Sequence, residues 1–152
     1  MLNRNIELNR MDGRVAAYCI ALSDKTGLGA FNMATTEAGS SMHAYDTTVD
    51  AREHQIEVIF RQAAVGFSAD DFLRQFAPPR PTHVKIDVDS IEARIIRGAH
   101  QVLGGPTVQS AWVEVMGSPD TPRNRDIAAA MAELGYRPQP RAADARNTEF
   151  RR

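Results

Sequence analysis

The chain has 152 residues, a length that fits one domain. Hydrophobic residues make up 43% and charged residues 24%, which is enough apolar material for a core and argues against wholesale disorder. The 18 basic and 19 acidic side chains are interspersed and leave a formal net charge of −1, so we expect no nucleic-acid partner.

The single cysteine bears on the cellular compartment. Cys19 lies in an apolar run and is interpreted as a small buried side chain. One cysteine excludes a disulfide framework and favours a reducing, cytoplasmic location. Residues 1–5 are polar and lack the apolar centre of a signal peptide. No stretch approaches 18 apolar residues, so we expect no membrane partner.

The N-terminal third contains one strong strand signal. Residues 2–9 have the spacing of the end of a helix, and 15–22 form a continuous apolar run. Such a run predicts a strand that is buried on both faces. Turn-forming residues follow at 23–27, and 29–33 predict a second, short strand. Residues 34–53 are rich in Thr, Ser, Ala and Asp without a clean period, which predicts a loop.

The rest of the chain alternates between strand and helix signals. Ser68 has the chemistry of an N-cap for a short helix that runs to Phe76. Strands are predicted at 55–62 (half exposed), 83–88, 110–116 and 148–152 (an edge strand), and helices at 91–103 and 124–134. This alternation favours a single α/β domain with a largely parallel sheet.

The sharpest local feature is an acidic strand end. Alternation places Lys85, Asp87 and Asp89 on one face of the strand, and both carboxylates at its carboxyl end, where open α/β sheets bind ligands. There they could act as a general base, bind a metal or stabilise a cation. Alternatively, Asp89 or Ser90 caps the next helix, with Glu92 in its first turn. Capping does not explain Asp87, which lies too far inside the strand.

Glu114 is the second candidate. It interrupts an otherwise apolar strand, and a carboxylate in that setting needs a partner. Lys85 is the candidate partner, because the two strands should be neighbours in a parallel sheet. Glu114 is then either one half of a structural ion pair or a member of the site.

The remaining motifs give little support for a catalytic, metal-binding or nucleotide-binding site. The four histidines (His43, His54, His83 and His100) lack metal-ligand spacing, so we expect surface or loop positions and no metal site. His43, in the predicted loop, has the best chance among them of touching a substrate. The glycines form neither G-x-G-x-x-G nor a P-loop.

Four segments, in order, carry a family resemblance. The string H-V-K-I-D-V-D-S-I-E at 83–92, followed by I-I-R-G-A at 95–99, resembles the FkbM methyltransferase signature K-I-D-V-[DE]-G-x-E and I-L-x-G-A. A-L-S-D at 21–24, F-S-A-D-D-F at 67–72 and V-E-V at 113–115 are similar to the segments that surround it. The match runs from about residue 2 to 116, and four ordered segments are far more specific than one.

The resemblance implies a Rossmann-like class I methyltransferase that uses S-adenosylmethionine. The expected acceptor is a hydroxyl group of a small molecule or a glycan. The resemblance implies catalytic roles for Asp87, Asp89, Glu92 and Glu114 and cofactor binding by Ser23 and Asp24, with no metal. Asp87 would hold the acceptor or polar atoms of the donor, and would take the hydroxyl proton.

Two departures from the family pattern affect these expectations. Ser90 stands where the family has glycine, which allows backbone conformations that serine disfavours. The family's first two strands and its glycine-rich donor loop lie upstream of the segment that resembles 2–9. The resemblance therefore predicts that 1–152 is one N-terminally incomplete domain with a partial sheet lacking those strands. It also predicts impaired activity and self-association through unpaired strand edges.

Two other functions fit parts of the sequence. One is a non-catalytic binding module that keeps remnants of the fold. The other is a glycosyltransferase, because Asp87-Val88-Asp89 is a D-x-D that could hold a metal and a nucleotide sugar. A helix that begins directly after this motif argues against the second.

Overall fold

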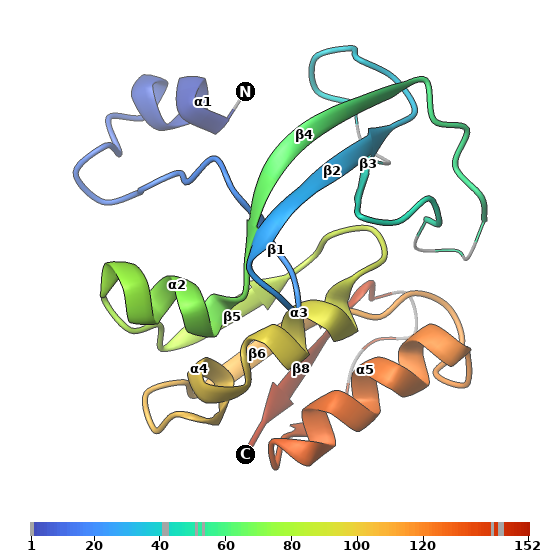
Figure 1. Ribbon diagram of the computed structural model, residues 1–152. Coiled ribbons are helices and arrows are strands. Elements are labelled where there is room, and N and C mark those ends of the chain that lie inside the picture. Colours follow the sequence, from blue (N-terminus) through green and yellow to red (C-terminus); the bar gives the residue numbers. More distant parts are fainter. Residues whose placement is uncertain (1, 41–42, 51, 53, 141, 143–144) are drawn as a thin grey trace.

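The computed structural model describes residues 2–40, 43–50, 52, 54–140, 142 and 145–152. Within these residues the chain forms five helices and two separate four-stranded sheets (Figure 1). The helices are α1 (Leu2–Leu8), α2 (Ala69–Phe76), α3 (Glu92–Gly98), α4 (His100–Gly104) and α5 (Pro122–Glu133). The strands are β1 (Ala21–Leu22), β2 (Gly27–Met33), β3 (His43–Tyr45), β4 (Phe60–Phe67), β5 (His83–Ile86), β6 (Ser110–Glu114), β7 (Arg137–Pro138) and β8 (Asn147–Arg151).

The first sheet has the order β1-β4-β2-β3 and is mostly antiparallel. Only the two-residue strand β1 runs parallel to its neighbour, β4. The buried ring of Tyr45 on β3 lies against two glycines, Gly29 and Gly66, which are on β2 and β4. A Cβ atom at either glycine would collide with this ring, so the sheet packs closely only because both positions lack a side chain.

The second sheet has the order β5-β6-β8-β7 and carries the larger core. β5 is parallel to β6, while β8 runs antiparallel between β6 and β7. Helices α3, α4 and α5 lie along one face of this sheet (Figure 1). None of the helices in the described part has the length and apolar character that a bilayer-spanning helix requires.

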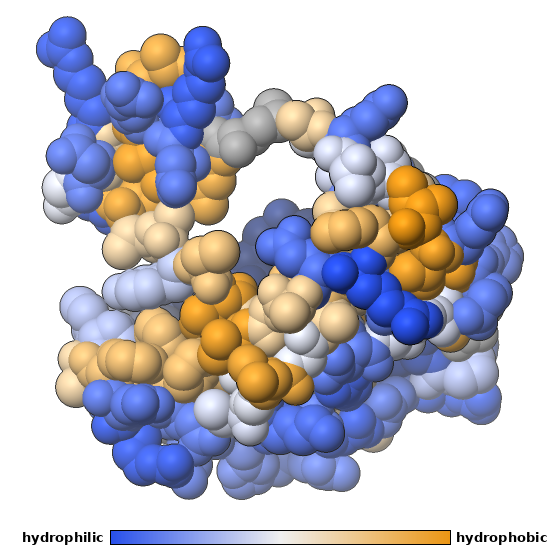
Figure 2. All heavy atoms as spheres, turned by 45° about the horizontal axis from the view of Figure 1, so that its top comes forward, coloured by the Kyte–Doolittle hydropathy of each residue, from blue (hydrophilic) through white to orange (hydrophobic). Residues whose placement is uncertain are grey.

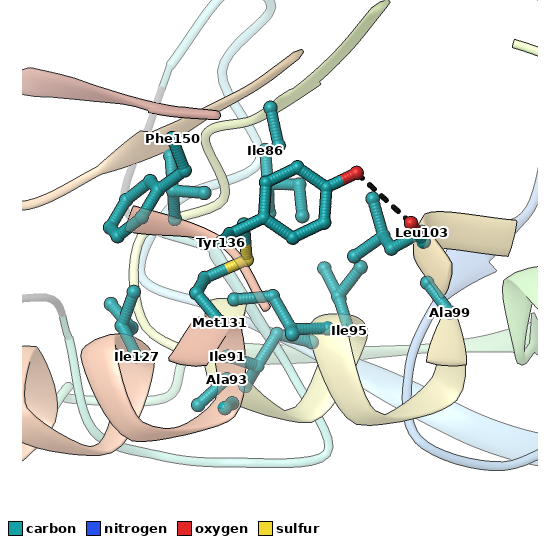
Figure 3. Packing of buried hydrophobic residues seen from close by; sticks show 14 of the residues in the cluster. Ile86, Ile91, Ala93, Ile95, Ala99, Leu103, Ile127, Met131, Tyr136 and Phe150 are labelled. Carbon is teal, nitrogen blue, oxygen red and sulfur yellow. Dashed lines mark hydrogen bonds between the residues drawn. The ribbon is translucent and has the colours of Figure 1, made fainter. Parts of the chain in front are cut away.

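Side chains from the sheet and its helices interlock in this core (Figure 3). Leu103, Val113, Ile127 and Met131 are fully buried. The buried hydroxyl of Tyr136 donates a hydrogen bond of 2.9 Å to the carbonyl oxygen of Leu103. The one polar atom of that ring is therefore satisfied inside an apolar core, as burial requires.

Most of the predicted helices and several strands are confirmed. Ser68 caps α2 by accepting a hydrogen bond of 3.1 Å from the amide of Asp71. β2, β5 and β6 lie within or overlap the strands predicted at 29–33, 83–88 and 110–116. The helix predicted at 91–103 is divided into α3 and α4 at Ala99, whose φ of −113° leaves the helical region.

The buried strand predicted at 15–22 is wrong except at its last two residues. Only Ala21–Leu22 pair, and Cys19 is exposed rather than buried. The run has the composition of a doubly covered strand, but β1 has a ladder partner, β4, on one side only among the described residues. The apolar residues before it therefore lack the neighbours that would bury them.

Three further predictions need correction. The structure has two sheets instead of the one predicted, and most strand pairs in both sheets are antiparallel instead of parallel. The strand predicted at 55–62 begins only at Phe60, and the predicted loop 34–53 contains β3, although 41–42, 51 and 53 lie outside the described residues. β8 is not an edge strand, because β7 pairs with its other side.

Candidate active site

The acidic pair lies at the carboxyl end of β5, as predicted. The side chain of Asp87 is 37% exposed and forms an ion pair of 2.7 Å with Nζ of Lys85. Asp89 is half-buried, and its φ of 53° is left-handed. Aspartate tolerates this conformation better than most residues. The non-glycine residues with positive φ do not include Ser90, so serine in place of the family's glycine strains no backbone here.

Neither Asp89 nor Ser90 occupies the N-cap position of α3. The N-cap residue is Ile91, which makes no side-chain capping hydrogen bond. Glu92 does lie in the first turn of α3, but it is fully buried. Its Oε1 accepts a long hydrogen bond of 3.4 Å from the amide of Val88. Glu92 thus ties the start of α3 to the segment that follows β5.

Glu92 and Glu114 share one arginine. Nη2 of Arg123 lies 2.7 Å from Oε1 of Glu92 and 3.3 Å from Oε2 of Glu114. The three side chains are at most 9% exposed. Arg123 is in the first turn of α5, directly after Pro122 and the N-cap Thr121. It therefore joins α5 to β6 and α3 in a buried group of two carboxylates and one guanidinium.

Lys85, predicted as the partner of Glu114, pairs with Asp87 instead. The register of β5 and β6 places Lys85 opposite Trp112, two residues before Glu114. The Lys85 side chain is 62% exposed, so its charge stays in solvent beside Asp87.

Burial raises the pKa of Glu114 above its ordinary value, and the neighbouring charges of Asp87, Glu92 and Asp89 add to the rise. The guanidinium of Arg123 opposes them. The other three carboxylates predicted as site residues therefore lie close enough to Glu114 to influence its charge. A carboxyl with a raised pKa can hold a proton at higher pH than an exposed glutamate does.

This raised pKa predicts a pH-dependent stability. The folded state binds the Glu114 proton more tightly than the unfolded chain, so the stabilisation is complete below about pH 4.5 and is lost as pH rises through the folded pKa. We expect Glu114→Gln to remove this loss. Urea unfolding at several pH values measures it, and parallel pH profiles for wild type and variant would contradict the assignment.

Ser23 and Asp24, expected to bind the cofactor, both contact α3. Arg94 donates hydrogen bonds of 2.9 Å to Oγ of Ser23 and of 2.8 and 3.0 Å to Oδ1 of Asp24. Ser23 is buried. Desolvation raises the pKa of Asp24, but hydrogen bonds from Arg94 and Ser23 outweigh it and the net shift is downward. These contacts join the turn after β1 to α3.

Sequence reasoning missed both arginines. Arg123 and Arg94 lie in helices without any local motif, and their carboxylate and hydroxyl partners are 9 to 71 residues away in the chain. The histidines are placed by ordinary contacts: His83 bonds Oγ of Ser110 at 3.0 Å, and His43 bonds Oγ of Ser40 at 3.0 Å. Within the described ranges, no three His, Cys, Asp or Glu side chains are arranged to hold a metal ion.

A large apolar hollow of about 740 Å³ lies beside the acidic end of β5. It separates β5 and α3 from the extended segment that precedes β1, and its walls include Tyr18, Ile20, Val84 and Ile86. Lys85 and Asp89 also line it, so the hollow reaches one carboxylate of the acidic pair, Asp89. Figure 2 shows the opening between the lobe that carries α1 and the body of the molecule, with apolar surface on both sides.

These features define an α/β protein with carboxylates at the end of a parallel strand, the position at which such sheets commonly bind ligands. The model of the methyltransferase FkbM domain matches residues 1–138, so the chain belongs to the FkbM methyltransferase family. No curated protein and no solved structure matches the chain significantly.

Proposed function

We propose that the chain carries the chemistry of a methyltransferase that moves a methyl group from S-adenosylmethionine to a hydroxyl oxygen of a small molecule or glycan. One observation supports this most directly. Asp87 is an exposed carboxylate that directly follows β5, within the residues that match the family model. The parallel β5-helix-β6 unit is also consistent with part of a Rossmann-like sheet.

The residues near β5 fit the donor better than those after β1. The sulfonium centre of the donor is a cation, and Asp89 is a carboxylate beside apolar walls that suit an aromatic base. Asp87 lies two residues before Asp89. Ser23 and Asp24 fit the donor less well, because Arg94 already bonds Oγ of Ser23 and Oδ1 of Asp24. The sequence contains no glycine-rich loop, so we expect the donor to bind this chain weakly.

The four acidic residues have different roles in this proposal. Asp87 orients the acceptor hydroxyl and takes its proton, because it is exposed and its ion-pair partner, Lys85, is solvent-exposed too. Asp89 lines the hollow and faces the cationic end of the donor. Glu92 and Glu114 are buried around Arg123 and hold the ends of β5 and β6 in place. The bound donor supplies an electrophilic methyl group with a good leaving group.

The direct test supplies methyl-labelled S-adenosylmethionine and a panel of hydroxyl acceptors, with release of S-adenosylhomocysteine as the readout. Transfer of label to an acceptor oxygen supports the proposal. Calorimetric titration of the donor measures affinity separately, and micromolar binding would contradict the expected weakness. A folded chain that neither binds donor nor transfers label at millimolar donor would favour the non-catalytic module.

Asp87→Asn is expected to lower the transfer rate by about tenfold to a hundredfold, the range for a positioned base. Asp89→Asn should have a smaller effect, because it contacts no acceptor in this proposal. Asp12→Asn, an exposed aspartate before β1, is the matched control. Initial rates at saturating acceptor measure the effect, and equal rates for wild type and Asp87→Asn would remove Asp87 from the site.

A further inference from the structure

One wall of the hollow is formed by the N-terminal part of the chain. We define the arm as residues 2–20, which comprise α1 and the extended run before β1 (Figure 1). The residues of the arm that line the hollow are Leu2, Ala16, Ala17, Tyr18 and Ile20. The facing wall belongs to β5 and α3, and the hollow opens between the lobe of the arm and the body (Figure 2). The position of the arm therefore determines how wide the hollow is.

The arm is held firmly at one end only. There it continues into β1, which pairs with β4, and the amide of Ser23 donates a hydrogen bond of 2.9 Å to the carbonyl of Phe67. Within the part of the chain that the structure describes, the hydrogen bonds of residues 2–20 all have their partners inside the arm. The ring of Tyr18 packs edge-on against Phe72 of α2, with 5.0 Å between the centroids. An element with so few ties to the body can move about its attached end at low cost.

The apolar side chains of the arm are left largely uncovered. No residue of α1 is buried, and residues 16–19 are exposed. Tyr18 is 59% exposed although it lines the hollow and contacts Phe72. A hollow of about 740 Å³ has the size and apolar lining of a small-molecule site. A molecule inside it would offer the arm an apolar surface to cover, so burial favours movement of the arm toward the body.

We propose that the arm closes as a lid over a molecule in the hollow, and that the ring of Tyr18 covers an aromatic part of that molecule. The proposal rests on the proposed function in one respect, because the expected occupant is the methyl donor with its aromatic base. Aromatic side chains stack on such bases. Closure excludes water from the hollow, which Asp89 also lines, and so strengthens the attraction between its carboxylate and the sulfonium.

The movement is measured by pulsed electron paramagnetic resonance between two spin labels. Cys19 is the only cysteine, is exposed and does not line the hollow, so it carries one label on the arm. His100→Cys, at an exposed position on α4, carries the other. S-adenosylhomocysteine or the neutral aromatic dye N-phenylnaphthylamine, at millimolar concentration, should shorten and narrow this distance. The matched control is the pair His100→Cys and Arg125→Cys with Cys19→Ser, because both labels are then on the body, and its distance should not change.

The role of the Tyr18 ring is tested by calorimetric titration with the same two probes. Tyr18→Ser should weaken binding by about tenfold to a hundredfold, the range for losing one stacked aromatic ring. Tyr18→Phe keeps the ring and its contact with Phe72, so it should bind as the wild type does. Leu28→Ser is the matched control, because Leu28 is 87% exposed and lies outside the hollow. Its affinity for both probes should be unchanged.

The two probes separate the lid from the proposed function. Closure with the dye but not with S-adenosylhomocysteine would support the lid and contradict the methyl donor as the occupant. Binding of S-adenosylhomocysteine with an unchanged distance between the labels at Cys19 and position 100 would overturn the lid and leave the methyltransferase proposal standing. Binding of neither probe would overturn both. Equal affinities of the wild type and Tyr18→Ser would overturn the role of the ring.

Discussion

Arg123→Met is expected to reduce the free energy of unfolding by about 3–5 kcal/mol, the range for removing one partner of a buried ion pair. The variant leaves Glu92 and Glu114 without the guanidinium that lies 2.7 and 3.3 Å from them. Both carboxylates are almost fully buried, so water does not replace the lost partner. Domain stability is typically about 5–15 kcal/mol, so this loss threatens folding itself.

Urea unfolding of Arg123→Met beside Arg125→Met measures the effect. Arg125 is exposed on the same helix, so its replacement should change stability by less than about 0.5 kcal/mol. The triple variant with Glu92→Gln and Glu114→Gln should recover part of the loss, because it removes the uncompensated charges. Equal stability of the two arginine variants would show that the buried group contributes little.

The acidic pair was predictable because its signal is local. A short strand followed at once by a helix fixes Asp87 and Asp89 at the carboxyl end of β5, whatever the rest of the fold does. The N-cap at Ser68 was predictable for the same reason, since its bond reaches only three residues along the chain. Local propensity and spacing determine features of this kind.

The partners of the acidic residues were not predictable. Lys85 was expected to reach Glu114 across neighbouring strands, but the register places it opposite Trp112. The actual partner, Arg123, depends on how α5 packs against the sheet. Arg94, about 70 residues later in the chain, binds both Ser23 and Asp24, and no motif in the sequence predicted this contact. Tertiary packing selects these pairs, and no spacing of residues along the sequence indicates them.

The strand predicted at 15–22 shows where composition can mislead. Eight consecutive apolar residues predict burial on both faces, but burial requires neighbours on both sides. The described residues supply β4 on one side of β1 and the apolar hollow on the other. The lack of a strand neighbour on that side of β1 therefore explains both the failed prediction and the hollow.

The glycine in the I-L-x-G-A part of the family signature, Gly98 here, has a physical reason in this structure. Gly98 is buried near the end of α3, against the turn that follows β1. A Cβ atom at this position would collide with the carbonyl oxygen of Ser23 and lie 3.0 Å from Cα of Asp24. Both obstacles are backbone, which cannot rotate away as a side chain can. The absence of a side chain at Gly98 therefore allows α3 to approach β1 closely enough for Arg94 to bind Ser23 and Asp24.

Gly98→Ala is therefore expected to destabilise the fold, although helix propensity alone predicts a gain of about 1 kcal/mol. Overpacking against fixed backbone costs about 1–3 kcal/mol or more, so the clash should decide the sign. Gly104→Ala is the matched control, because its nearest new contact would be Cδ2 of Leu134 at 3.9 Å, an ordinary distance. That variant should be neutral or slightly more stable. Thermal and urea unfolding of both variants measure the difference, and a Gly98→Ala protein as stable as Gly104→Ala would show that α3 can move away from β1 at little cost.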